Sequence, residues 1–151
     1  MVTFRTLGAG LAGVALAACG QLTGPDDPVY EARPSVIAPG FGVGIGTVLA
    51  ADSVRVGEVL AVVVPTQGGG CVRQGETRVQ RLSDFAVEVL PYDSVLARTS
   101  NVACTADLRV LDHAAAVRFY RRGQATLRVR GRGGDYTTDR DIVVERAVTV
   151  Y

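Results

Sequence analysis

Apolar and polar side chains alternate along most of the chain from residue 29 onwards, with the period of two residues that is typical of half-buried β-strands. In one such run, Val54 and Val56 alternate with Ser53 and Arg55. Similar runs, separated by Gly, Pro or Asp, lie at residues 36–38, 43–49, 59–64, 78–81, 85–89, 117–120, 125–130 and 142–151. About seven to nine short strands at this spacing predict an all-β domain, an antiparallel sandwich or barrel.

Turn residues predict where the chain reverses. Gly-Glu at residues 57–58 predicts a turn, and Pro-Tyr-Asp-Ser at residues 91–94 predicts the end of a strand. Arg-Gly-Gln at residues 122–124 predicts a hairpin that joins the runs at 117–120 and 125–130.

The stretch 105–117 leaves two interpretations open. It could be a helix capped by its first residue, a threonine. The other interpretation is a strand at 107–111, a turn near Asp112 and a second strand from Ala114.

The first eighteen residues predict a targeting segment. They contain one charged side chain, Arg5, and a charge-free apolar run from residue 7 to residue 18. A membrane-spanning helix needs about 20 apolar residues, whereas the apolar core of a signal peptide has about 7–15. The run therefore predicts a signal peptide and an exported protein.

The apolar run ends in Leu16, Ala17, Ala18 and Cys19. This tetrapeptide resembles the lipobox of bacterial lipoproteins, in which a leucine and two small residues precede a cysteine. The resemblance implies cleavage before Cys19, diacylglycerol on its thiol and an acyl chain on its new amino group, which together suffice for stable membrane attachment. Gly20 differs from the aspartate that retains lipoproteins in the inner membrane of enteric bacteria, which favours the outer membrane. The alternative is an ordinary secretory signal in which Cys19 is incidental.

The predicted organisation has three parts: a lipoprotein signal peptide at 1–18, a flexible tether at 19–28 and one β-sandwich domain at 29–151. The tether is polar and rich in Gly, Pro and Asp. With 48% hydrophobic and 21% charged residues, the chain as a whole is not of the disordered class, and its 18 glycines argue against a helical bundle.

Two cysteines remain after Cys19, namely Cys71 and Cys104. In an exported protein such a pair predicts a disulfide, with free thiols or a metal site as the alternatives. The pair resembles the single inter-sheet bridge of immunoglobulin-like domains, which implies an antiparallel Ig-like β-sandwich. The chain has no Trp, so the buried tryptophan of those domains is missing. The resemblance therefore concerns architecture and not family membership.

Candidate catalytic groups are few. His113 is the only histidine, and if it lies on a strand it shares a face with Val117 and Phe119. It is then expected to be a hydrogen-bonded histidine at the edge of the core and not a catalytic base. We expect no catalytic residue, no metal site and no cofactor.

Three other motifs have structural explanations that are simpler than a role in ligand or metal binding. Residues 8–13 match the G-x-G-x-x-G dinucleotide pattern but lie in the segment that is removed. The alternating glycines at 40–46 predict a strand that is closely covered by another element. The three aspartates at 135–141 predict a solvated hairpin loop and not a calcium site.

Charge is distributed unevenly along the predicted mature chain. Residues 19–97 contain five Arg and nine acidic residues, whereas residues 98–151 contain ten Arg and six acidic residues. The outward positions of the predicted hairpin hold four of the arginines: Arg118, Arg128, Arg130 and Arg132. These four could form a cationic face that binds phosphate or carboxylate groups. The alternative is a solvated face that keeps a sheet edge from aggregating.

These features predict a lipid-anchored binding or adhesion-type module of the bacterial cell envelope, without catalytic activity. The alternative is a structural accessory lipoprotein of a larger envelope complex. The membrane is the expected partner of the lipid. The expected partners of the arginines are an envelope protein, a polysaccharide, anionic lipid or the protein's own acidic half. Nucleic acid is not expected in the cell envelope.

Changing Cys19 to Ser tests the anchor. The protein with Cys19 intact should be recovered with membranes, and its mass should show loss of residues 1–18 and gain of lipid. The variant should leave the membrane fraction, because the acyl chains have no other attachment point. Membrane attachment that is unchanged in Cys19→Ser would contradict the prediction.

Overall fold

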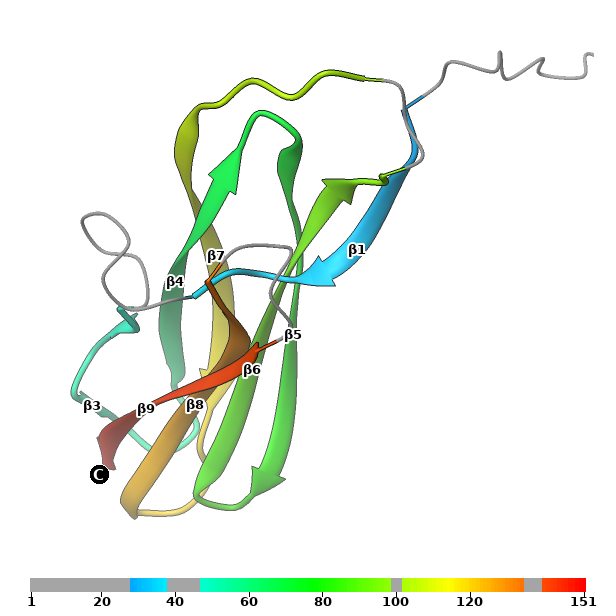
Figure 1. Ribbon diagram of the computed structural model, residues 1–151. Helices are drawn as coiled ribbons and strands as arrows, with labels where there is room; N and C mark the ends of the chain where they lie inside the picture. Colours follow the sequence, from blue (N-terminus) through cyan, green and yellow to red (C-terminus); the bar gives the residue numbers. More distant parts are fainter. Residues whose placement is uncertain (1–27, 38–46, 99–101, 135–139) are drawn as a thin grey trace, which may run out of the picture.

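Nine strands make up the described part of the chain in the computed structural model, which describes residues 28–37, 47–98, 102–134 and 140–151. They belong to one sheet that curls into a half-barrel (Figure 1). The strands are β1 (Tyr30–Pro34), β2 (Leu49–Ala50), β3 (Ser53–Val54), β4 (Val59–Gly69), β5 (Val72–Ser83), β6 (Ala86–Leu96), β7 (Leu108–Arg118), β8 (Gly123–Gly133) and β9 (Arg140–Val150). The predicted signal peptide, Cys19, most of the tether, the glycines at 40–46 and residues 135–139 lie outside the described residues.

The sheet is mixed. Its strand order is β2-β4-β5-β6-β8-β9-β3, with β7 paired to β4 and β1 paired to β6. The β6–β8 and β3–β9 pairs are parallel and the others are antiparallel. The β6–β8 pair is parallel because the intervening strand, β7, lies beside β4 and returns the chain to its starting direction. The prediction of an all-β domain is confirmed, but an antiparallel Ig-like sandwich is not.

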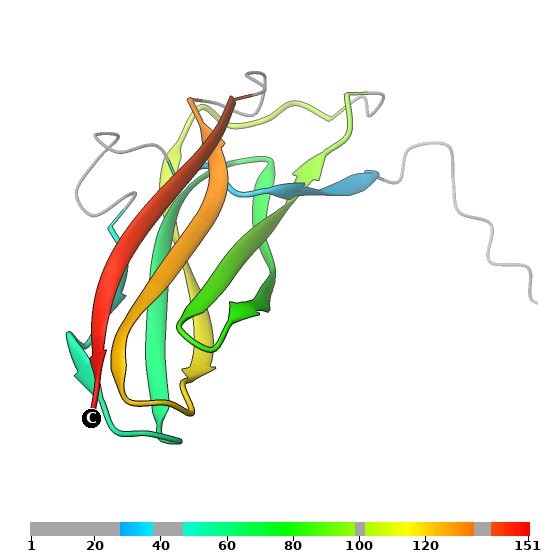
Figure 2. The same ribbon diagram turned by 90° about the horizontal axis from the view of Figure 1, so that it is seen from below.

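The core lies between two walls of this curled sheet. One wall is β4 with β7, and the other contains β6, β8 and β9 (Figure 2). Period-two alternation turns one apolar face of each strand inward. The fully buried side chains include Val62 of β4, Phe119 after β7, Val89 of β6 and Leu127 of β8.

The predicted hairpin between 117–120 and 125–130 is wrong. The turn exists, but β7 pairs with β4, and β8 pairs with β9 and β6. The chain therefore crosses from one wall to the other at this point. Both segments contribute inward side chains to the same core, so they must face each other across it and cannot lie side by side.

Strand β6 continues through the predicted turn at 91–94. Pro91 has no N–H to donate to a neighbouring strand, and the pairing with β5 is irregular between Gln74 and Thr77, opposite this proline. Gly75 lies in the irregular stretch, where a Cβ would come within 2.5 Å of the Tyr92 carbonyl oxygen. This bulge in β5 accommodates the proline, so β6 continues past it as a strand.

Strand β7 is continuous from residue 108 to residue 118, so the helix interpretation of 105–117 is wrong and the two-strand interpretation is wrong about the turn. There is no helix, and the chain does not turn at Asp112. Every residue of β7 pairs with β4, from Leu108 opposite Gly69 to Arg118 opposite Val59. This long ladder outweighs the helix propensity of the alanines, which is the highest of any residue but differs from that of most others by less than about 1 kcal/mol per residue.

Residues 35–37 close one side of the half-barrel. The Ser35 N–H donates to Pro91 O of β6, and the Val36 carbonyl accepts from Gln67 N of β4. Two further bonds, Ile37 N to Arg132 O and Arg132 N to Ser35 O, join the segment to β8. Gly131 permits this approach, since a Cβ there would lie 2.6 Å from Ser35 O. The segment thus connects both walls through the backbone.

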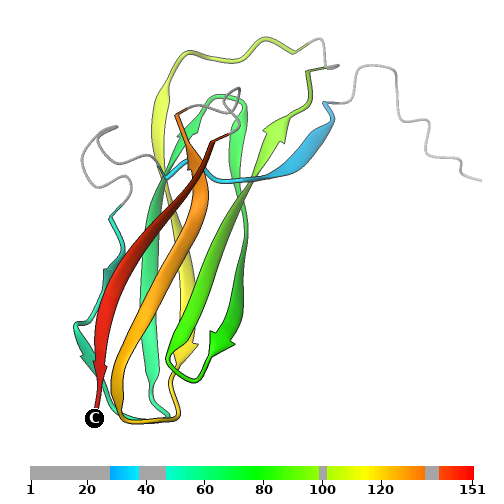
Figure 3. The ribbon, with the colours of Figure 1, turned by 60° about the horizontal axis from the view of Figure 1, so that its bottom comes forward.

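The predicted disulfide is present between Cys71 and Cys104. It joins the turn between β4 and β5 to the segment that precedes β7. Leu96, which pairs with Tyr30 of β1, donates its N–H to Cys71 O. The bridge therefore lies at the end of the barrel where β1 begins, and not in the middle of two facing sheets. The chain leaves β9 at the other end (Figure 3).

Removing the disulfide should destabilise the fold. In the chain-entropy model, a closed loop of about 34 residues contributes up to roughly 4 kcal/mol. We expect Cys71→Ala/Cys104→Ala to lower the free energy of unfolding by about 2–4 kcal/mol in a urea titration. The native protein in excess reductant is the control and should lose the same amount. Equal stability with and without the bridge would contradict the prediction.

Candidate functional site

The two walls face each other along a seam between β5 and β7. In the described residues, β5 pairs with β6 along its length and β7 pairs only with β4, so no backbone ladder joins β5 to β7. Side chains cross the seam instead. Gln74 Nε2 donates to Asp112 O at 2.9 Å, and an Arg81 guanidinium nitrogen donates to Arg118 O at 2.6 Å. Between these two contacts lies a buried histidine.

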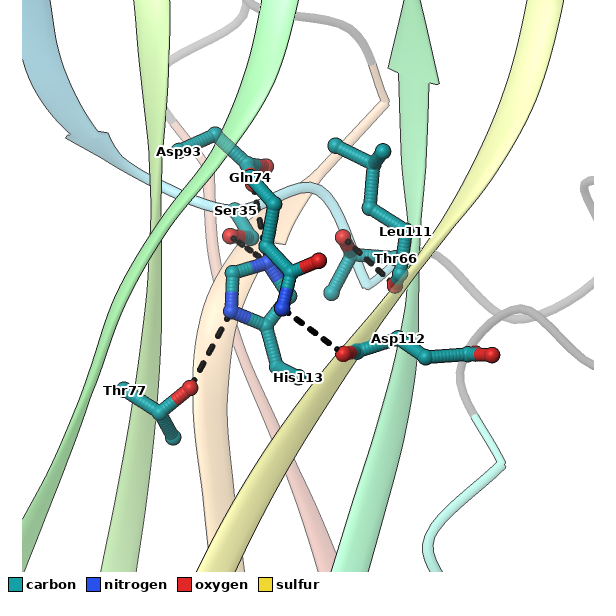
Figure 4. Close-up of polar contacts among 8 residues, drawn as sticks. All are labelled: Ser35, Thr66, Gln74, Thr77, Asp93, Leu111, Asp112 and His113. Carbon is teal, nitrogen blue, oxygen red and sulfur yellow. Dashed lines mark hydrogen bonds and ion pairs between the residues drawn. The ribbon is translucent and has the colours of Figure 1, made fainter.

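His113 has partners on both ring nitrogens (Figure 4). Its Nε2 lies 2.9 Å from Asp93 Oδ1 and 3.4 Å from Ser35 Oγ, and its Nδ1 lies 3.1 Å from Thr77 Oγ1. The side chains of Ser35, Asp93 and His113 are fully buried. With its proton on Nε2, the ring donates to Asp93 and accepts from Thr77, and every ring group is satisfied. The ring joins β7 to β5, β6 and residue 35.

Ser35, His113 and Asp93 have the residue types of a nucleophilic triad, but their arrangement differs from one. In a triad the carboxylate and the hydroxyl lie on opposite nitrogens, so that the ring can take the hydroxyl proton while the carboxylate orients it. Here both lie on Nε2. Together with the complete burial of all three side chains, this favours a structural role. The sequence predicted a hydrogen-bonded histidine on the face of Val117, and the structure places His113 there.

Towards the β5–β6 turn the seam opens into a groove of about 300 Å³. The walls of the groove come from β5, β6 and the end of β7, and combine apolar and arginine side chains. The residues that line this β5–β7 groove are Val79, Arg81, Val87, Ala116, Val117, Arg118 and Tyr120.

The groove exposes a side chain from the core face of the sheet. Val79 lies directly opposite Val89 in the β5–β6 ladder, so both point to the same face. Val89 is fully buried, yet Val79 is 45% exposed, because no strand covers this part of β5. Tyr120, on the other side of the groove, is 63% exposed. The groove is therefore an unfilled part of the core face.

Two arginines in the groove bind carbonyl groups and no carboxylate. Arg81 donates to Arg118 O, and its guanidinium lies 5.2 Å from the centre of the Tyr120 ring. Arg118 donates to Gly57 O. Neither has an ion pair with another described residue, whereas the neighbouring Arg121 is paired with Asp84 at 3.1 Å. Their positive charges are available to an anionic ligand.

Three of the four arginines of the predicted cationic face, Arg128, Arg130 and Arg132, lie on one face of β8. Arg118 does not join them, because it is on β7, in the wall opposite β8. Arg128 pairs with Glu145 at 3.1 Å, Arg130 pairs with the buried Glu88 at 3.2 Å, and Arg132 is only 7% exposed.

The uneven charge of the chain is instead matched within the fold. Arg130, Arg146 and Arg121 of the basic half pair with Glu88, Asp52 and Asp84 of the acidic half. These ion pairs show that the acidic half of the chain is a partner of the arginines.

The β5–β7 groove has no counterpart in the predictions from the sequence pattern. The pattern predicts only residues 78–81 of β5 as a strand, and it places β7 in a hairpin with β8. The alternation of Val79 and Arg81 was visible, but the partner across the groove depends on the crossing of β7 to the other wall, which has no local sequence signal.

Comparisons with known proteins give no relative: no family model, no curated protein and no solved structure matches this chain. The described residues do not bring three or more His, Cys, Asp or Glu side chains together as a metal site would need. A helix with the length and hydropathy of a membrane span is not found among them either.

The contributions of His113 and Asp93 to the free energy of unfolding should depend strongly on each other. Removing one partner of a buried pair leaves the other unsatisfied, which costs about 3–5 kcal/mol. We expect Asp93→Ala and His113→Ala each to lose about that amount in urea unfolding, and the double variant to lose at least about 1 kcal/mol less than their sum. The milder Thr77→Val should cost about 1 kcal/mol. Strictly additive losses would show that the two side chains do not interact.

Proposed function

We propose that this protein is a binding module of the bacterial cell envelope without catalytic activity, held at the membrane by lipid on Cys19, and that it binds its partner in the β5–β7 groove. The anchor rests on the lipobox-like residues 16–19. The binding role rests on one observation, the groove itself.

The groove combines apolar and cationic groups, as recognition sites do, although its lining is more polar than that of a typical small-molecule pocket. Here Val79 and Tyr120 offer exposed apolar surface, and Arg81 and Arg118 offer two guanidinium groups held by hydrogen bonds to main-chain carbonyls. A partner that covered Val79 would complete the packing that Val89 already has on the same face.

The position of the groove suits a tethered protein. The described chain begins at the end of the barrel that holds the start of β1, whereas the groove lies near the β5–β6 turn at the other end (Figure 1). A lipid attached ahead of β1 would leave the groove facing away from the anchoring membrane. This favours an envelope protein or polysaccharide as the partner over lipid of the same membrane.

The non-catalytic part of the proposal is supported by the His113 cluster. Its serine and carboxylate compete for the same ring nitrogen, and all three side chains are closed off from solvent. The groove itself is lined by arginine, tyrosine and apolar residues, and its lining contains no carboxylate, histidine or cysteine.

An immunoglobulin-like architecture is also part of the proposal. Two walls that share one core and a single disulfide support it. The two parallel strand pairs and the position of the bridge at one end of the barrel are the departures from that pattern.

Site-specific photo-crosslinking in intact cells tests the binding role. A benzophenone side chain at Ala116, which lines the groove, should give an adduct with an envelope component. The same group at Ala147, an exposed alanine of β9, is the matched control and should give none. Val79→Glu should abolish the Ala116 adduct, because it puts a charge on the apolar surface. No adduct at Ala116, or equal adducts at both positions, would overturn the proposal.

A further inference from the structure

We infer that the β5–β7 groove accepts an extended peptide segment of another protein as an added β-strand, and that acidic side chains of this segment bind Arg81 and Arg118. The inference rests on the proposed binding role of the groove and specifies the kind of partner and its mode of binding. Four features of the seam support it.

First, β5 and β7 turn unpaired edges toward each other. In the described residues, β5 makes its ladder with β6 and meets β4 only at the Gly69–Val72 turn, while β7 makes its ladder with β4 alone. The second edge of each strand is therefore a row of backbone N–H and C=O groups without strand partners. Such edges are templates for another strand.

Second, side chains keep the two edges apart. Gln74 reaches Asp112, Thr77 reaches His113 and Arg81 reaches Arg118. From one contact to the next the residue numbers increase in both strands, so β5 and β7 run in the same direction on the two sides of the seam. In the lower seam an arginine side chain makes the connection, and no backbone hydrogen bond joins β5 to β7 among the described residues. A strand needs about 4.8 Å on each side.

Third, small side chains line the space between the contacts. Below His113 the next residues of β7 are Ala114, Ala115 and Ala116, of which the first and the last are exposed. On the β5 side, Val79 is 45% exposed. Small side chains on one edge let a backbone approach, and the exposed valine offers apolar surface for the partner's own side chains.

Fourth, the charge of the groove selects the partner. Arg81 and Arg118 have no acidic partner among the described residues, and both already point their guanidinium groups at oxygen atoms of the main chain. A carboxylate is a stronger acceptor for the arginine fork than a neutral carbonyl. A segment that alternates apolar and acidic residues would therefore place apolar side chains against Val79 and carboxylates near the arginines.

The test uses the purified protein and three synthetic peptides. The probe is acetyl-Thr-Val-Glu-Val-Thr-Val-Glu-Thr-amide, labelled with a fluorophore for anisotropy. The second peptide has Lys in place of both Glu, and the third keeps both Glu but has Pro in place of the valines, which removes the amide donors of a strand. We expect the second and third peptides to bind at least about tenfold more weakly than the first.

Variants of the protein give an independent readout. Arg81→Gln/Arg118→Gln should weaken binding of the acidic peptide by about tenfold or more. Arg140→Gln, at an exposed site on β9, is the matched control and should bind as the native protein does. Hydrogen exchange with the bound acidic peptide should slow at the amides of residues 78–80 and 114–117, which lie between the side-chain contacts. Unchanged exchange there would overturn strand addition even if the peptide bound.

Other outcomes separate this inference from the proposed function. If the peptide does not bind but Ala116 still gives its adduct, the strand mode is wrong and the binding role stands. If the proline peptide binds as well as the first, the groove recognises charge alone. Binding to phosphatidylglycerol vesicles that requires Arg81 and Arg118, without peptide binding, would replace the peptide by a lipid surface.

Discussion

The curl of this sheet depends on a connection made by side chains where a backbone ladder is missing. On one side of the half-barrel, residues 35–37 join the two walls by main-chain hydrogen bonds. On the other side, the His113 ring joins β7 to β5 and β6. The ring therefore connects the edges of β5 and β7 through side chains, and the groove lies farther along the same seam.

A buried polar group at this position also gives the fold specificity. Hydrophobic side chains at residues 93 and 113 would pack in many arrangements, whereas a ring with defined partners on both nitrogens permits one. Asp93 can meet His113 only because β6 continues past Pro91 as a strand. The irregular pairing at Gln74 and Thr77 that accommodates the proline therefore also positions the carboxylate and the threonine hydroxyl.

Local patterning predicted the strands well, because period two is imposed by the core on every strand that faces it. The runs at 59–64, 78–81, 85–89, 125–130 and 142–151 all lie mostly or wholly within observed strands. Pairing is a different matter. Val117 and Leu127 carry the same apolar signal whether their strands are neighbours or face each other across the core, so the sequence pattern could not distinguish a hairpin from a crossing between walls. The same ambiguity assigned Arg118 and Arg128 to one face. It hid the groove, whose two sides come from strands that are far apart in sequence.

The order of the strands also constrains when the protein can fold. Strand β9 pairs with β8 along its whole length, and Val148 and Val150 are buried in the core. At its other edge β9 holds β3, which begins almost ninety residues earlier in the chain. The core therefore cannot close until residue 150 has been synthesised, and a growing chain lacks its final packing until then. For the export that we propose, this delay would leave the chain without its final packing while it passes through an export channel.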